Sequence, residues 1–143
     1  MDLVTVVGVC GMGVMGSAVA SRLHRDGVRV VTSVTGRSEA TRRRAARSGA
    51  IDLGSLNAVV EEADVVLSIT GSAAAISLAH EIAGAVAETV ATVTVAECNL
   101  ISPDDMAVIG EALTRGGARV VDAGIVGPPP GGHRAPTFYV SGP

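Results

Sequence analysis

Apolar residues occur along the chain in short runs, and the segments between the runs have helical periodicity. The runs predict strands at residues 3–9, 28–34, 50–53, 65–69, 92–96, 119–123 and 137–141. The segments between them predict helices at residues 14–25, 38–48, 55–62, 73–87 and 102–115. Because strand and helix alternate without a break, we expect one α/β domain over residues 1–143. Its sheet should be doubly wound and mainly parallel, with helices on both faces.

The first predicted strand runs into a glycine-rich turn. Gly11, Gly13 and Gly16 form the pattern G-x-G-x-x-G between an apolar strand and an alanine-rich helix. Gly11 permits a tight turn, Gly13 lets the backbone approach a pyrophosphate, and Gly16 lets the helix pack close to the strand. The helix would direct free N–H groups at the phosphates. We therefore expect a Rossmann dinucleotide-binding domain; the alternative is a glycine-rich turn that binds no ligand.

The segment after the second predicted strand bears on the type of dinucleotide. An NAD site usually has Asp or Glu at the end of this strand, whereas an arginine accommodates the 2′-phosphate of NADP. Here the segment after the strand is Thr35-Gly36-Arg37-Ser38, and it contains no carboxylate before Glu39. The sequence therefore favours NADP (NADPH) over NAD. Arg37 is the expected phosphate ligand, since a guanidinium matches phosphate oxygens, and Ser38 is an expected hydroxyl donor.

Three successive arginines follow on the next predicted helix. We expect Arg42 to assist in phosphate binding, and Arg43 and Arg44 to lie on a solvated helix face. A basic patch for nucleic acid is disfavoured because no aromatic residue is interleaved with the arginines and the net charge is −3.

The end of the fourth predicted strand carries Thr70-Gly71-Ser72. In a doubly wound sheet, ligands bind at the carboxyl ends of the strands, so these residues are expected to line the cofactor. Ser72 also fits the N-cap of the following helix, and both roles are compatible.

Composition and a few single residues bear on the core, the cellular location and metal binding. Hydrophobic residues are 48% and aromatic residues 1%, which predicts a Val, Ala, Leu and Ile core. Cys10 and Cys98 form no disulfide framework, which favours a reducing, cytoplasmic location. No metal site is expected, because His80-Glu81 has Gly84 where a second zinc-binding histidine would stand. Asp2 and the glycines argue against a signal peptide in the uncharged N-terminal stretch, and we expect no membrane association.

Four segments together resemble the β-hydroxyacid dehydrogenases, which include 3-hydroxyisobutyrate dehydrogenase, 6-phosphogluconate dehydrogenase and the imine reductases. Residues 11–16 are similar to G-L-G-x-M-G, and residues 36–38 to the N-R-T of NADP-using members. Residues 97–103 are similar to D-x-S-T-x-S-P, and residues 122–127 to D-A-P-V-S-G. The resemblance implies NADP-dependent hydride transfer on a β-hydroxyacid, a sugar acid or an imine-like substrate. With the residues above, it implies cofactor contacts from Met12, Val14, Met15, Cys98 and Asn99.

The chain departs from the family pattern on the substrate side. Asn99 stands where a hydroxyl helps to hold the substrate carboxylate, and Val126 and Pro128 replace residues of S-G-G. These changes resemble a phosphogluconate-dehydrogenase-like subgroup with a distinct C-terminal domain. The residues expected to face the substrate are Asn99, Gly124, Val126 and Gly127.

The helical domain that supplies the family's catalytic lysine and dimer interface is expected to be absent, because the 143 residues contain no lysine. We therefore expect the cofactor-binding half of an NADP-dependent oxidoreductase, completed by a C-terminal domain, a second chain or a homo-oligomer. The alternative is a non-catalytic NADP(H)-binding module that needs a partner chain.

Overall fold

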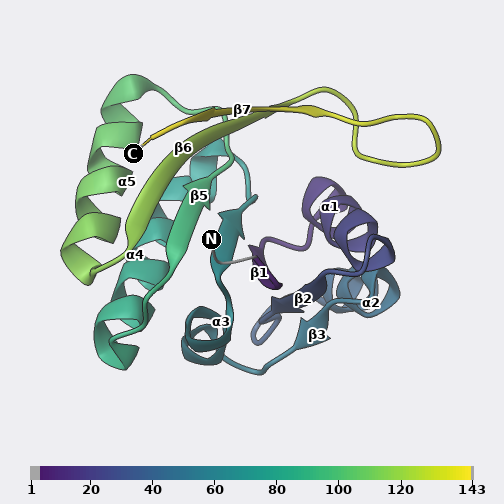
Figure 1. Cartoon of the computed structure of the whole chain (residues 1–143), viewed down its shortest axis with the longest axis horizontal. Helices are drawn as coiled ribbons and strands as arrows, with labels where there is room; N and C mark the ends of the chain where they lie inside the picture. The colour runs from purple at the N-terminus through teal and green to yellow at the C-terminus, as the bar shows by residue number, and fades with distance from the viewer. Residues whose placement is uncertain (1–3, 143) are drawn as a thin grey trace.

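The computed structural model describes residues 4–142 (Figure 1). One seven-stranded sheet has the order β3-β2-β1-β4-β5-β6-β7. Its strands are β1 (Val6–Cys10), β2 (Arg29–Thr32), β3 (Ile51–Asp52), β4 (Val65–Ser68), β5 (Thr94–Glu97), β6 (Arg119–Val126) and β7 (Thr137–Ser141). The helices are α1 (Val14–Arg25), α2 (Glu39–Ser48), α3 (Leu56–Glu62), α4 (Ser72–Thr89) and α5 (Pro103–Gly116). Leu3, the predicted start of the first strand, lies outside the described residues.

The order of the strands confirms the doubly wound, mainly parallel α/β fold. The chain starts in the interior of the sheet with β1, moves outward through β2 and β3, and returns to β4 on the other side of β1. Strands β4, β5 and β6 continue in parallel. The connections from β1 and β4 therefore diverge at the carboxyl ends of these two strands, which is where such folds bind ligands.

The last strand departs from the parallel arrangement. Strand β6 continues to Val126 rather than ending at residue 123, and β7 returns antiparallel to it, with Val126 opposite Thr137. The predicted loop at 124–136 is therefore shortened to 127–136. No helix separates the two strands, and an antiparallel pair needs none because a hairpin connects adjacent ends.

Helices cover both faces of the sheet. Helices α1 and α2 pack together on one face, and α4 lies between α3 and α5 on the other (Figure 1). The two core clusters consist mainly of Val, Ala, Leu and Ile, as the composition predicted. Phe138 and Tyr139 are both exposed, so neither fills the core.

Serine caps begin three of the helices, as predicted. The hydroxyls of Ser38, Ser55 and Ser102 each accept a hydrogen bond from a backbone N–H three residues later. Ser72 differs from its predicted capping role: Gly71 is the N-cap of α4 and Ser72 is its first helical residue. Among residues 4–142, no helix is long and apolar enough to span a membrane, and no cluster of side chains suits a metal ion.

Candidate functional site

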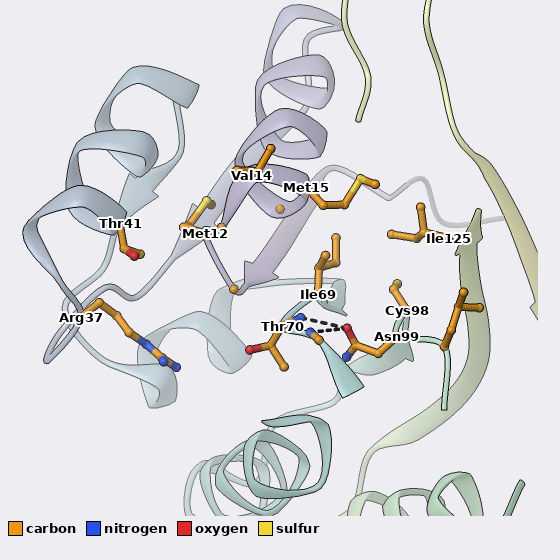
Figure 2. A pocket seen from close by; sticks show the side chains of 15 residues that line it. Met12, Val14, Met15, Arg37, Thr41, Ile69, Thr70, Cys98, Asn99 and Ile125 are labelled. Atoms are coloured by element: carbon orange, nitrogen blue, oxygen red, sulfur yellow. Dashed lines mark hydrogen bonds between the residues drawn. The ribbon is translucent and has the colours of Figure 1, made fainter. Parts of the chain in front are cut away.

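A cleft of about 470 Å³ opens at the carboxyl ends of β1, β4 and β5 (Figure 2). It lies at the point where the connections from β1 and β4 diverge. Its lining combines the glycine turn, the start of α2 and the two loops after β4 and β5. The lining residues are Gly11, Met12, Gly13, Val14, Met15, Gly16, Arg37, Thr41, Ile69, Thr70, Gly71, Cys98, Asn99, Leu100 and Ile125.

The three glycines of the turn have different surroundings. Gly11 has a φ of 107°, and a Cβ added there would overlap the carbonyl oxygen of Ile69. A Cβ on Gly16 would overlap the carbonyl oxygen of Gly11. A Cβ on Gly13 would meet nothing within 4 Å. Gly11 and Gly16 are therefore required by the fold, whereas Gly13 leaves space on the cleft side of the turn.

Helix α1 presents uncapped N–H groups at this turn. Its N-cap is Gly13, so no side chain bonds the first N–H groups, and the first turn holds no acidic residue. The earliest bond within the helix runs from Ser17 N to Gly13 O at 2.9 Å. The N–H groups before Ser17 and the positive end of the helix dipole remain available to an anion. The turn therefore fits a pyrophosphate.

Asn99 joins the loops on the opposite wall. Its Oδ1 accepts hydrogen bonds from Thr70 N at 3.0 Å and Gly71 N at 2.8 Å (Figure 2). Its Nδ2 donates to Ser68 O at 3.3 Å and to Glu97 Oε1 at 2.6 Å. Asn99 lines the cleft as predicted, but its amide is occupied by these internal bonds.

Glu97 is a buried carboxyl that the sequence did not single out. It is 0% exposed, and its Oε1 accepts from both Asn99 N and Asn99 Nδ2. Its Oε2 and the Ser68 hydroxyl have no hydrogen-bond partner among the described residues. Burial raises the pKa of Glu97 and the charge of Asp122 adds to this effect, while the bonds from Asn99 oppose it. Glu97 is therefore a buried carboxyl whose pKa is raised and whose Oε2 is unpaired, within residues 4–142, next to the cleft.

Arg37 lies where the sequence placed it. It is exposed and extends from the loop before α2 in the direction of Thr70 (Figure 2). It lines both the main cleft and a neighbouring hollow of about 370 Å³, which reaches from Cys10 to Glu81 on α4. Arg37 therefore connects two spaces at the ends of β1 and β2.

Other predicted residues of this segment lie outside the cleft lining. Ser38 caps α2, and its hydroxyl is 3.0 Å from Thr41 Oγ1. Arg42 Nε donates to the carbonyl of Arg37 at 3.1 Å, which braces the loop. Gly36 has a φ of 76° and serves the turn. Thr41, which the sequence analysis did not select, lines the cleft.

Arg43 and Arg44 behave differently from each other. Arg43 is exposed and pairs with Glu39 at 2.6 Å, as predicted for a solvated face. The same prediction is wrong for Arg44, which is half-buried and donates from Nε to the carbonyl of Met12 at 2.9 Å. The contact spans 32 residues along the chain, so local periodicity could not indicate it.

The predicted substrate side is only partly brought to the cleft. Gly124, Val126 and Gly127 do not contribute to its lining, and neither does Ser72; Leu100 and Ile125 do. Cys98 lines the cleft as a buried thiol. Burial raises its pKa to about 12, with the charge of Glu97 adding to the shift. Cys98 therefore presents a neutral thiol.

Residues 6–143 match the family described as the NAD binding domain of 6-phosphogluconate dehydrogenase. The chain belongs to this family. It is accordingly an NAD(P)-binding domain of the oxidoreductase type, and the predicted superfamily is confirmed. No curated protein matches the chain significantly.

Solved structures have the same fold. A conserved protein of unknown function, described as structurally similar to 3-hydroxyacid dehydrogenases, is 30% identical with a TM-score of 0.74, over 86% of this chain and 44% of that one. An imine reductase of Streptomyces aurantiacus is 21% identical with a TM-score of 0.78, over 96% and 47%. A 3-hydroxyisobutyrate dehydrogenase of Mycobacterium tuberculosis is 21% identical with a TM-score of 0.68, over 87% and 42%. The chain thus spans less than half the length of these proteins.

Proposed function

We propose that the chain is the NADP-binding half of an oxidoreductase that transfers a hydride to or from a β-hydroxyacid, a sugar acid or an imine-like substrate. The observation that carries the proposal is the open space at Gly13 beside the uncapped start of α1. A pyrophosphate bound there would accept from the free N–H groups of residues 14–16. The nicotinamide supplies the hydride chemistry, and the chain binds and orients it.

Arg37 supports NADP over NAD. Its guanidinium pairs with no carboxylate among residues 4–142, and the segment from β2 to Ser38 contains no carboxylate. Glu81 also borders the neighbouring hollow, but from α4 rather than from the end of β2. We place the 2′-phosphate at Arg37, with Arg42 holding the loop that carries it.

The remainder of the active site would come from another domain or chain. The chain contains no lysine, and its similar structures are more than twice as long as the aligned part. Phe138, Tyr139 and Val140 of the edge strand β7 are 39%, 63% and 67% exposed, which suits a surface covered in an assembly. We propose a helical domain, a partner chain or a second copy as the cover.

The internal bonds of Asn99 favour a second candidate function. Because Asn99 is saturated by Thr70, Gly71, Ser68 and Glu97, its amide is not free for a substrate. A non-catalytic NADP(H)-binding subunit would need no such group. It would bind NADPH and catalyse no hydride transfer in any complex.

Calorimetric titration with NADPH and NADH tests the cofactor assignment. Arg37→Ala should weaken NADPH about 10- to 100-fold, because hydrogen bonds to charged groups contribute about 1.5–3 kcal/mol and 1.4 kcal/mol is tenfold. NADH binding should change little. Arg43→Ala removes one nearby positive charge that is paired with Glu39, and serves as the control. An equal loss of affinity for NADPH and NADH in Arg37→Ala would refute the assignment of NADP. Absence of binding by the unaltered chain would refute the proposed function.

A further inference from the structure

Arg44 links helix α2 to the glycine turn. Its Nε donates to Met12 O at 2.9 Å, and its Nη2 donates to Thr41 Oγ1 at 3.2 Å. It does not line the main cleft. We propose that Arg44 is a positioning residue of the cofactor site, which holds the turn in its binding conformation. The inference rests on the proposed function, since it assigns the control of that same site.

The Met12 carbonyl is an effective point at which to hold the turn. It lies between Gly11 and Gly13, and glycine backbones rotate more freely than those of other residues. The peptide bond that joins Met12 to Gly13 is planar and trans, so the Gly13 N–H points opposite to the Met12 carbonyl. Fixing the carbonyl toward Arg44 therefore fixes the N–H away from Arg44. Met12 is 2% exposed and belongs to a core cluster, so the same residue is also held in the core.

The second bond of Arg44 extends the link to the start of α2. Thr41 Oγ1 lies 3.0 Å from the hydroxyl of Ser38, the residue that follows Arg37. One hydrogen-bonded path thus runs from the turn proposed for the pyrophosphate to the loop proposed for the 2′-phosphate. This path explains why Arg44 is directed inward while its neighbour Arg43 pairs with Glu39 on the surface.

The charge of Arg44 acts in the same direction. Among residues 4–142 its guanidinium pairs with no carboxylate, unlike those of Arg22, Arg29, Arg43 and Arg115. Its positive charge is therefore not cancelled locally and favours any anion at the turn. Both the orientation and the charge serve the pyrophosphate, which NAD and NADP share. Loss of Arg44 should weaken the two cofactors equally, whereas loss of Arg37 should be selective.

The experiment compares Arg44→Ala, Arg44→Lys and the control Arg43→Ala by two measurements. The first is amide hydrogen exchange of the Ser17 N–H without cofactor, because its bond to Gly13 O at 2.9 Å closes the turn, with α5 as the internal reference. The second is the affinity for NADPH and NADH. We expect faster exchange in the turn but not in α5. Both affinities should fall by a similar factor of about 5–30, which is about 1–2 kcal/mol at 1.4 kcal/mol per tenfold change.

Arg44→Lys keeps the charge but lacks the planar fork, so it should fall between the parent and Arg44→Ala. If Arg44→Ala does not fold, the comparison is made between Arg44→Lys and the parent. Unchanged exchange in the turn, or a loss confined to NADPH, would overturn the proposal; the latter would make Arg44 a phosphate ligand. If the parent binds neither cofactor, the proposed function fails, and hydrogen exchange still decides whether Arg44 holds the turn.

Discussion

Alanine substitutions at Gly13 and Gly16 should separate cofactor binding from stability. Gly13 has φ −72° and ψ −166°, which alanine adopts, and its Cβ would meet nothing within 4 Å. Alanine is a poorer N-cap than glycine by roughly 0.5–1 kcal/mol. It also stabilises the folded state by about 0.4–1 kcal/mol, because it reduces the conformational entropy of the unfolded chain. These terms oppose each other, so the free energy of unfolding of Gly13→Ala should stay within about 0.5 kcal/mol of the parent.

Gly16→Ala should destabilise the chain strongly. Its Cβ would overlap the carbonyl oxygen of Gly11, a backbone atom held in a turn with positive φ. Overpacking of a core typically costs about 1–3 kcal/mol, and a rigid backbone partner places this case at about 3 kcal/mol or more.

Urea unfolding and cofactor titration distinguish these effects. Gly13→Ala should unfold like the parent yet bind NADPH and NADH more weakly, since the added methyl occupies the space proposed for the pyrophosphate. Gly84→Ala, in an open position of α4, is the control and should gain up to about 1 kcal/mol without changing cofactor affinity. Undiminished cofactor binding by Gly13→Ala would refute the location of the pyrophosphate. Parental stability in Gly16→Ala would refute the packing argument.

Two carboxyl groups give predictions for stability against pH. The folded pKa of Glu97 is raised by burial above its usual 4.5, so the free energy of unfolding should fall as the pH rises from about 4.5 through the folded pKa; Glu97→Gln should remove this slope. An unchanged slope in urea titrations would contradict it. The folded pKa of Asp64 is lowered below 3.8 by hydrogen bonds from Val6 N and Thr5 N, so its contribution should be lost as the pH falls below that value. Asp64→Asn should flatten the acid limb of the same titration, and parental acid sensitivity would argue against this role.

The parts of the fold that the sequence predicted depend on local patterns. The alternation of apolar runs and amphipathic segments located all the helices and strands in the described residues, with ends shifted by a few positions. The glycine spacing located the turn, because positive φ at Gly11 and close approach at Gly16 exclude other residues. The serine caps could also be predicted from the sequence, because the capping hydroxyl and the N–H that it accepts from are only three residues apart.

The parts that the sequence did not predict depend on distant partners. The direction of β7 follows from the sheet edge that β6 offers, which the apolar run at 137–141 cannot specify. Arg44 is indistinguishable from Arg43 by residue type, and only the position of Met12, 32 residues earlier, separates their roles. From the sequence Glu97 is only the last residue of a strand, because its complete burial depends on the neighbouring strands β4 and β6 that pair with β5.

The two walls of the cleft are held in place differently, and this difference supports the proposed location of the pyrophosphate. On one wall Arg44 binds a carbonyl of the turn and leaves the N–H groups at the start of α1 unoccupied. On the other wall Asn99 accepts from the N–H groups of Thr70 and Gly71, so these donors are already used. We therefore propose that the turn at 11–16 binds the phosphates, while the loop after β4 contributes shape. On this proposal the recognisable motif consists of glycines because the binding groups are backbone amides, and the side chain that orients them, Arg44, lies elsewhere in the sequence.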